Sequence, residues 1–172
     1  MASVLKSRRT AMLAALAAAA PLALTQPASA ADPAVVVCTT SSDWSYSPGV
    51  VLQPRPLRTT VHDKYSSCAG AGTGHSEFVV DRSAGCLEPL GTVPETRVIT
   101  WSDGSTSTFS YTVTVTSLPG ADVVTKLGTI TGGVYAGRSA QAVQAAPTLD
   151  LLKCLSTEGI TRQSSLGTFT VL

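Results

Sequence analysis

Two histidines, His62 and His75, are the only side chains whose ordinary pKa lies near neutral pH, so they are the candidates for a general base. A serine hydrolase also needs an activated nucleophile, which many such enzymes present on a Gly-x-Ser-x-Gly turn. That turn is absent, because Gly74-His-Ser-Glu-Phe78 and Gly137-Arg-Ser-Ala-Gln141 both lack the final glycine. We therefore predict no catalytic residue and keep a small extracellular hydrolase, with His62 or His75 as base, as an alternative.

The same region holds residue types that bind metals. His75 and Glu77 are two positions apart, so a strand would place both on one face, and His62-Asp63 lies nearby in the sequence. Two histidines without a further ligand pattern favour a solvated loop over a zinc or copper site. The 11 acidic residues are dispersed and form no paired-carboxylate, calcium-loop or phosphate-loop pattern. We predict no metal and no cofactor.

Trp44 and Tyr46 are the candidate binding residues. They lie in the hydroxyl-rich stretch Thr39–Ser47, where no clean alternation surrounds them. Exposed aromatic rings beside hydroxyl groups can form a platform for stacking sugars or an anchor in a protein interface. The alternative is that both rings cover the end of the fold, since isolated aromatic residues usually close a core.

The first 30 residues have the features of an export signal. Met1–Arg9 is basic without an acid, and the uncharged run from Ala11 to Leu24 is shorter than the roughly 20 residues of a membrane-spanning helix. Ala28-Ser29-Ala30 fits the small-x-small sequence that signal peptidase cleaves. We predict a signal peptide over residues 1–30 and one secreted, extracellular domain over residues 31–172. The arginine pair Arg8-Arg9 also suggests twin-arginine export, but Thr10-Ala11-Met12 after it matches that motif poorly, so the sequence favours the general secretory route.

Charge excludes some partners of the secreted domain. Loss of Lys6, Arg8 and Arg9 with the signal leaves nine basic and eleven acidic residues, a net charge of −2. A nearly neutral domain lacks the basic footprint of a nucleic-acid-binding protein and the polybasic segment that anionic lipid attracts. We expect neither nucleic acid nor, after signal removal, a membrane as its partner.

Four cysteines, Cys38, Cys68, Cys86 and Cys154, lie in the secreted part. An even number in an exported chain indicates two disulfides, and the lack of a Cys-x-x-Cys pair disfavours a zinc site. Three pairings are open. We expect Cys68–Cys86, closing the glycine-rich loop over residues 69–74, and Cys38–Cys154, joining the two ends of the domain.

The clearest strand signal lies in residues 97–116, where apolar and hydroxyl side chains alternate. Asp103-Gly104 indicates a hairpin there. A two-residue turn would place Ile99 and Trp101 on the hydroxyl face, whereas a three-residue turn places both on the apolar face with Phe109. Because burying Trp101 outweighs the difference between turn types, we predict the three-residue turn, with Gly104 in the left-handed conformation.

Short strands at regular spacing fill the rest of the domain. Strands are expected over residues 34–38, 57–65, 77–81, 123–131 and 167–172, with turns at Ser47-Pro48-Gly49 and Pro119-Gly120. The segment 134–145 favours strand over helix, and 149–155 is open between a helical turn and a strand. Seven to nine strands of this kind predict an all-β, disulfide-bonded antiparallel β-sandwich, Ig-like in architecture, with a barrel as the second choice.

Several of these segments together resemble secreted actinobacterial proteins to which no function is assigned. The resemblance is carried by Cys38, Ser47-Pro48-Gly49, Ser67-Cys68, Trp101-Ser-Asp-Gly-Ser105, Gly132-Gly-x-Tyr-Ala-Gly137 and Leu151-Leu-Lys-Cys154. These are turn, disulfide and core positions, so the resemblance implies secretion and a β-fold and supplies no catalytic residue.

The sequence thus leaves three classes of function. The first is a secreted, non-catalytic binding or surface-associated module, with a cell-wall glycan or an extracellular protein as partner. The second is a secreted protease inhibitor, for which the glycine-rich segment over residues 69–74 would be a poorly rigid contact loop. The third is the small extracellular hydrolase.

Overall fold

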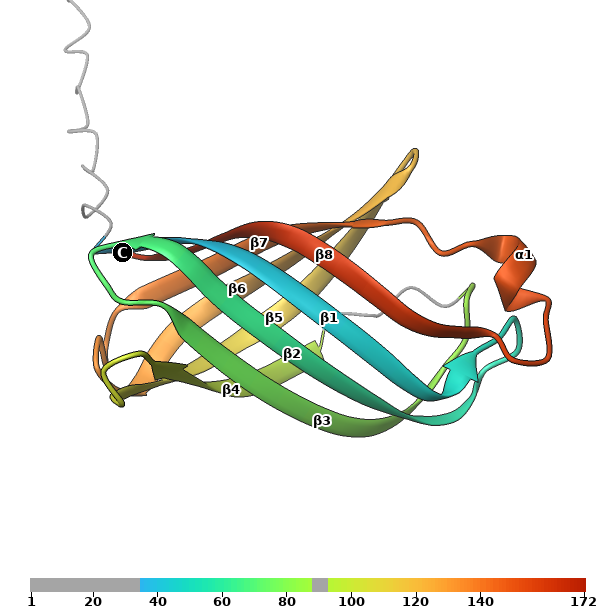
Figure 1. The fold of residues 1–172 in the computed structure, drawn as a ribbon, viewed down its shortest axis with the longest axis horizontal. Coiled ribbons are helices and arrows are strands. Elements are labelled where there is room, and N and C mark those ends of the chain that lie inside the picture. Colours follow the sequence, from blue (N-terminus) through green and yellow to red (C-terminus); the bar gives the residue numbers. More distant parts are fainter. Residues whose placement is uncertain (1–34, 88–92) are drawn as a thin grey trace, which may run out of the picture. The chain divides into compact units, whose positions relative to one another are not determined.

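The fold is known from a computed structural model that describes residues 35–87 and 93–172 (Figure 1). The signal peptide expected over residues 1–30 lies outside the described residues. Eight strands and one short helix follow in the order β1 (Val36–Val50), β2 (Arg55–Ala69), β3 (Gly74–Ala84), β4 (Val93–Trp101), β5 (Thr106–Leu118), β6 (Ala121–Gly133), β7 (Ser139–Pro147), α1 (Leu151–Cys154) and β8 (Ile160–Val171).

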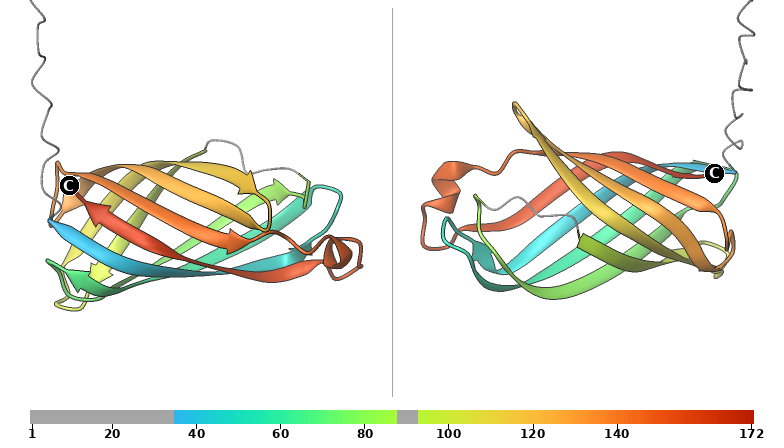
Figure 2. Two further views of the ribbon diagram at one scale, coloured as in Figure 1. Left: turned by 90° about the horizontal axis from the view of Figure 1, so that it is seen from above. Right: turned by 180° about the vertical axis from the view of Figure 1, so that it is seen from behind.

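All eight strands belong to one closed, antiparallel barrel (Figures 1 and 2). Each strand pairs with the next along the chain, and β8 returns to pair with β1, where Val36 lies opposite Val171. The all-β prediction is confirmed, whereas the β-sandwich is wrong and the second choice, a barrel, is what forms. β1, with 15 residues, pairs along both edges, and the pairing runs from strand to strand through all eight and back to β1, so the sheet does not divide into two layers.

The hairpin between β4 and β5 has the predicted register. Thr100 lies opposite Thr106, and the amide of Gly104 donates a hydrogen bond to the carbonyl of Trp101 at 3.0 Å. Gly104 has a φ of +84° and Trp101 is buried, so the three-residue turn is confirmed. Two other segments differ from the sequence prediction or complete it. Ser47-Pro48-Gly49, expected to be a turn, lies inside β1, and the segment 149–155, for which a helical turn and a strand were both possible, contains α1.

A dense apolar plug fills the barrel at the end where β1 begins and β8 finishes. Its aromatic members are Tyr65, Trp101, Phe109, Tyr111 and Phe169. The ring of Phe169 packs edge-on against Tyr65 and Phe109, with centroid distances of 5.1 and 5.6 Å. The indole N–H of Trp101 finds a hydrogen-bond acceptor inside the plug, because it donates to the Ser107 hydroxyl at 2.9 Å. This end of the barrel is therefore closed.

The disulfides are Cys38–Cys68 and Cys86–Cys154, and the expected pairing is wrong. Cys68 is at the end of β2, directly beside the start of β1, because Val37 lies opposite Ala69. Cys86 follows the far end of β3, so the length of that strand separates it from Cys68. Each disulfide consequently ties a different end of the barrel, one beside the plug and one at α1.

The seam between β3 and β4 is short. These strands pair only at Gly74–Trp101 and His75–Thr100, after which they diverge (Figure 2). The inward side chains of β3 beyond that point, Phe78, Val80 and Arg82, are only half-buried. Among the described residues, the facing backbone edges of β3 and β4 therefore lack a strand partner over most of their length.

No helix of the described segments is long and apolar enough to cross a membrane.

Candidate functional site

A layer of charged and polar side chains crosses the barrel interior directly next to the plug, and Asp63 is its centre. This carboxylate is 1% exposed. Its neighbours across the sheet on either side are Ser42 in β1 and Ser76 in β3, and both hydroxyls donate hydrogen bonds to it. The strand register thus supplies two donors to Asp63 before any charge is considered.

Two buried cations complete the surroundings of Asp63. The Arg97 guanidinium donates a hydrogen bond to Oδ2, and the Lys126 ammonium lies 3.8 Å from Oδ1. Burial alone would raise the pKa of the Asp63 carboxyl, but Lys126, Arg97 and the two serine hydroxyls outweigh burial and hold this pKa below its usual range. Asp63 is therefore ionised at any physiological pH.

Arg97 links Asp63 to a second carboxylate, that of Glu95. The guanidinium reaches Glu95 Oε2 at 3.4 Å, and the Tyr111 hydroxyl donates to the same oxygen at 2.8 Å. The guanidinium carbon of Arg97 also stands 4.7 Å from the ring centroid of Phe78, a cation–π contact. Arg97 is thus held on three sides by groups from β2, β3 and β4.

Lys126 is held much more loosely. Its closest carboxylate oxygen, on Asp63, is beyond hydrogen-bonding distance, and its ammonium lies 5.9 Å from the ring centroid of Tyr111. Burial lowers the pKa of Lys126 to about 8, because the attraction of Asp63 offsets only part of the desolvation and Arg97 adds repulsion. A buried ammonium with this pKa still carries its charge at neutral pH.

Beyond the charged layer the barrel is hollow. A narrow inner space beside Arg97 and Lys126 has a volume of ≈ 40 Å³, and an outer cavity of ≈ 450 Å³ continues toward α1. Trp44, Tyr46, Arg82 and Val124 line both, so the two spaces adjoin. The outer cavity reaches solvent at Leu87 and Leu151, which are 66% and 57% exposed. Two further hollows, of ≈ 630 and ≈ 490 Å³, are more open to solvent.

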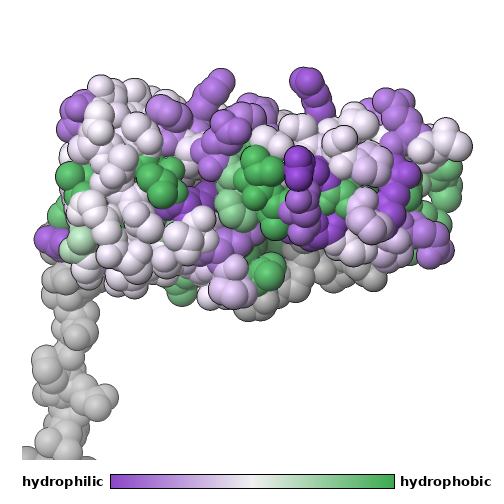
Figure 3. All heavy atoms as spheres, turned by 90° about the horizontal axis from the view of Figure 1, so that it is seen from below, coloured by the Kyte–Doolittle hydropathy of each residue, from purple (hydrophilic) through white to green (hydrophobic). Residues whose placement is uncertain are grey.

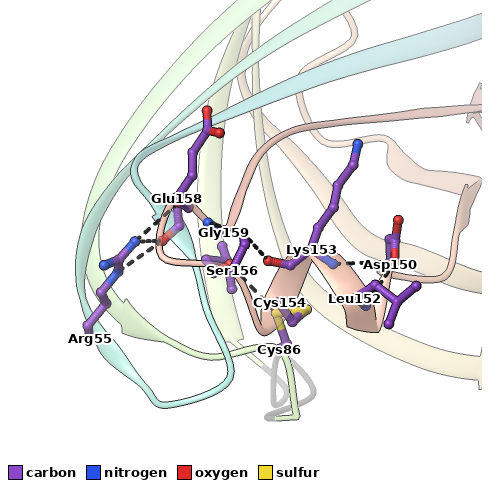
Figure 4. The surroundings of a disulfide bond; sticks show 11 residues. Arg55, Cys86, Asp150, Leu152, Lys153, Cys154, Ser156, Glu158 and Gly159 are labelled. Atoms are coloured by element: carbon purple, nitrogen blue, oxygen red, sulfur yellow. Dashed lines mark hydrogen bonds between the residues drawn. A yellow bond between two sulfur atoms is a disulfide. The ribbon is translucent and has the colours of Figure 1, made fainter.

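Figure 4 shows the disulfide and the hydrogen bonds that fix α1, and Leu151 of this helix lines the outer cavity. The Asp150 carboxylate caps the helix by accepting hydrogen bonds from the amides of Leu152 and Lys153, and Cys154 is bonded to Cys86. Arg55 donates to the carbonyl of Gly49 and thereby ties the start of β2 to the end of β1. The mouth of the outer cavity is therefore built from several crosslinked segments.

The two histidines and their acidic neighbours do not come together as one site. His62, His75 and Glu77 all point outward from the wall, where His62 Nδ1 lies 3.8 Å from Glu77 Oε2 in an exposed pair. Asp63, their neighbour in sequence, points inward. Among the described residues, no three His, Cys, Asp or Glu side chains are placed to hold a metal ion.

The structure places Trp44 and Tyr46 in the cavity wall, half-buried. Binding through these two residues stays a prediction, but a flat, exposed sugar platform is not what they form. The Tyr46 hydroxyl donates to Gln163 at 3.1 Å, and burial raises the pKa of its phenol to about 12 against the opposing effect of Arg82.

Sequence reasoning missed the charged layer, although a signal for it was present. In Val61-His-Asp-Lys-Tyr65 the alternation places Asp63 on the same face as two apolar residues. Lys126 stands in the same relation to Val124, and Arg97 to Ile99. A charged residue at an inward strand position rarely occurs unless it is paired, and three such positions in one domain indicate an interior ionic network.

Fold and site together define an eight-stranded up-and-down β-barrel that is plugged at one end, crossed by a charged layer and hollow at the other end. No protein-family model matches this chain, and no curated protein and no solved structure shows significant similarity to it.

Proposed function

We propose that this protein is a secreted, non-catalytic binding protein that holds a small, largely apolar molecule inside the barrel. The supporting observation is the outer cavity, whose volume of ≈ 450 Å³ lies within the roughly 300–1,000 Å³ typical of small-molecule sites. Its wall combines aromatic and aliphatic side chains, Trp44, Tyr46, Val115 and Val124 among them, with few polar groups. Such a wall favours apolar molecules over sugars.

Two further features support this proposal. Both disulfides fit an oxidising, extracellular environment, in agreement with the predicted export signal. The histidines that a hydrolase would use lie on the outer wall, away from the cavity. An inhibitor loop over residues 69–74 finds no support either, because the disulfide of Cys68 goes to Cys38 and does not enclose that loop.

The test is binding of N-phenyl-1-naphthylamine, an uncharged apolar dye whose fluorescence rises when it leaves water. We expect saturable binding by the purified protein and a loss of at least about tenfold in affinity on Ala84→Phe, because Ala84 lines the outer cavity and a larger side chain would fill it.

The matched control is Val79→Phe on the same strand, since Val79 points outward and is 49% exposed. Circular dichroism of both variants checks that the barrel still forms. No saturable dye binding by the wild-type protein, or equal affinity of a folded Ala84→Phe variant, would refute the proposal.

A further inference from the structure

We infer that the molecule bound in the barrel carries a single negative charge, and that its acidic group lies at the inner end of the cavity against Lys126, Arg97 and Arg82. This inference rests on the proposed function and adds the chemical class of the ligand. The rest of the ligand would lie in the outer cavity.

The charges around the inner space are not balanced. Three cationic side chains face it, Arg82, Arg97 and Lys126, and two carboxylates stand beside them, Asp63 and Glu95. The next acidic group, Asp122, lines only the outer cavity, two strand positions beyond Val124. The unmatched charge is that of Arg82, which is half-buried, and a partly desolvated positive charge is unfavourable unless an anion accompanies it.

Hydrogen-bond donors at the inner end are also unused. The Nε atoms of Arg82 and Arg97 and the Oγ1 of Thr59 are buried without a hydrogen-bond partner among the described residues. Thr59 and Arg97 are 1% and 5% exposed, and both line the inner space. Buried polar groups are nearly always satisfied, so these three indicate acceptor atoms that a ligand would bring.

Asp63 does not supply that acceptor. Its oxygens already accept hydrogen bonds from Ser42, Ser76 and Arg97, and Lys126 remains 3.8 Å away. A carboxylate at the inner end would offer oxygens to Lys126 and to the free Nε groups in charge-assisted hydrogen bonds. The apolar wall at Trp44, Val113 and Val124 then contacts the remainder of the molecule.

The probes are dodecanoate and 1-dodecanol, which share an apolar chain and differ in head group and charge. Each is titrated against the protein loaded with N-phenyl-1-naphthylamine. We expect dodecanoate to displace the dye at about tenfold lower concentration than the alcohol, because only the acid pairs with the inner cations. On Lys126→Met the ratio of the two affinities should fall toward one.

The control variant is Lys64→Met, which removes an exposed lysine from the outer wall and should leave the ratio unchanged. The comparison of acid and alcohol on the wild-type protein needs no variant, so the inference stays testable if Lys126→Met does not fold. Dye binding with no preference for dodecanoate overturns this inference and leaves the proposed function standing. Absence of dye binding overturns the proposed function itself.

The pH profile separates a direct role of Lys126 from a structural one. Asp63, Glu95, Arg97 and the Tyr111 ring surround its ammonium, and the pKa of Lys126 is about 8 without ligand. Affinity for dodecanoate should therefore decline as pH rises above about 8, while affinity for the alcohol stays level. A level profile for dodecanoate would place its head group elsewhere and overturn the assignment.

Discussion

Asp63 carries a structural duty that is distinct from ligand binding. It is the shared counter-ion of Arg97 and Lys126, and the hydroxyls of Ser42 and Ser76 fix its orientation from the two adjacent strands. Without its negative charge, two cations would face each other in the barrel interior. The charged layer is for that reason stable only as a unit.

We predict that Asp63→Asn lowers the free energy of unfolding by about 3–5 kcal/mol, the range for breaking a buried ion pair. Denaturant unfolding followed by tryptophan fluorescence measures this loss. The control is Asp81→Asn, which removes an exposed partner of Arg58 and should change stability little. Equal losses in the two variants would contradict the prediction.

The same carboxylate gives stability a defined pH dependence. The folded-state pKa of Asp63 lies below its unfolded value of about 4, so its contribution is fully present above pH 4 and is lost as pH falls through the folded pKa. The wild-type protein should lose stability in this acid range, and Asp63→Asn should lose less over the same range.

For single residues, the sequence predicted conformation and burial best where a pattern within one hairpin determines them. The position of Gly104 and the burial of Trp101 follow from a turn and an alternation inside one hairpin. Asp63 and Lys126 lie on different strands, β2 and β6, and meet only across the closed barrel. Nothing in the local sequence of either residue specifies the other.

Among the strands, β6 shows how closely neighbouring backbones approach where the barrel curves. A Cβ added at Gly128 would lie 2.0 Å from the carbonyl oxygen of Ser110 and 2.5 Å from the Cα of Tyr111. Backbone atoms cannot move aside as a side chain can, so this position needs glycine for space.

We predict that Gly128→Ala destabilises the barrel by about 1–3 kcal/mol or more, because the strands must separate locally. Thermal unfolding by circular dichroism measures the effect. Gly132→Ala on the same strand is the matched comparison, since its Cβ would meet only the Thr108 side chain, at 3.5 Å from Oγ1 and 3.7 Å from Cβ. A similar loss at both positions would show that glycine flexibility, and not close approach, is at issue.

The short seam between β3 and β4 predicts uneven hydrogen exchange. Along β3 beyond Ser76 and along β4 before Ile99, alternate amides face the opening without a strand partner among the described residues. These amides should exchange much faster than those of β5 from Phe109 to Val113, where β5 pairs with β4 on one side and with β6 on the other. Residue-resolved exchange by NMR tests this, and uniform protection across these strands would refute it.

For the molecule as a whole, the sequence predicted which segments form strands better than it predicted how those strands are arranged in space. Alternating hydroxyl and apolar residues identify strands and their buried faces, and the number of strands falls within the expected seven to nine. The same alternation fits a sandwich and a barrel, because each requires one buried face per strand. Closure depends on pairing between β1 and β8, the segments that lie farthest apart in the chain.

The prediction of the disulfide pairing was wrong for the same reason, because it too depends on contacts between segments that lie far apart in the chain. Which cysteines are adjacent depends on strand length and on the direction in which each strand crosses the barrel.

The pattern on the outer surface follows from the sequence more directly. On the face seen in Figure 3, apolar side chains form separate clusters among polar ones. That mixture corresponds to the outward positions of the alternating strands.

The pairing of β1 with β8 also sets an order of events during folding. Hairpins between consecutive strands can form as soon as both strands are available, but the outer edge of β1 has no partner until the segment Ile160–Val171 arrives. A chain cut short before β8 would keep two open edges, on β1 and on β7, and unpaired edges promote aggregation. The barrel can therefore close only after the whole chain, through Val171, is available.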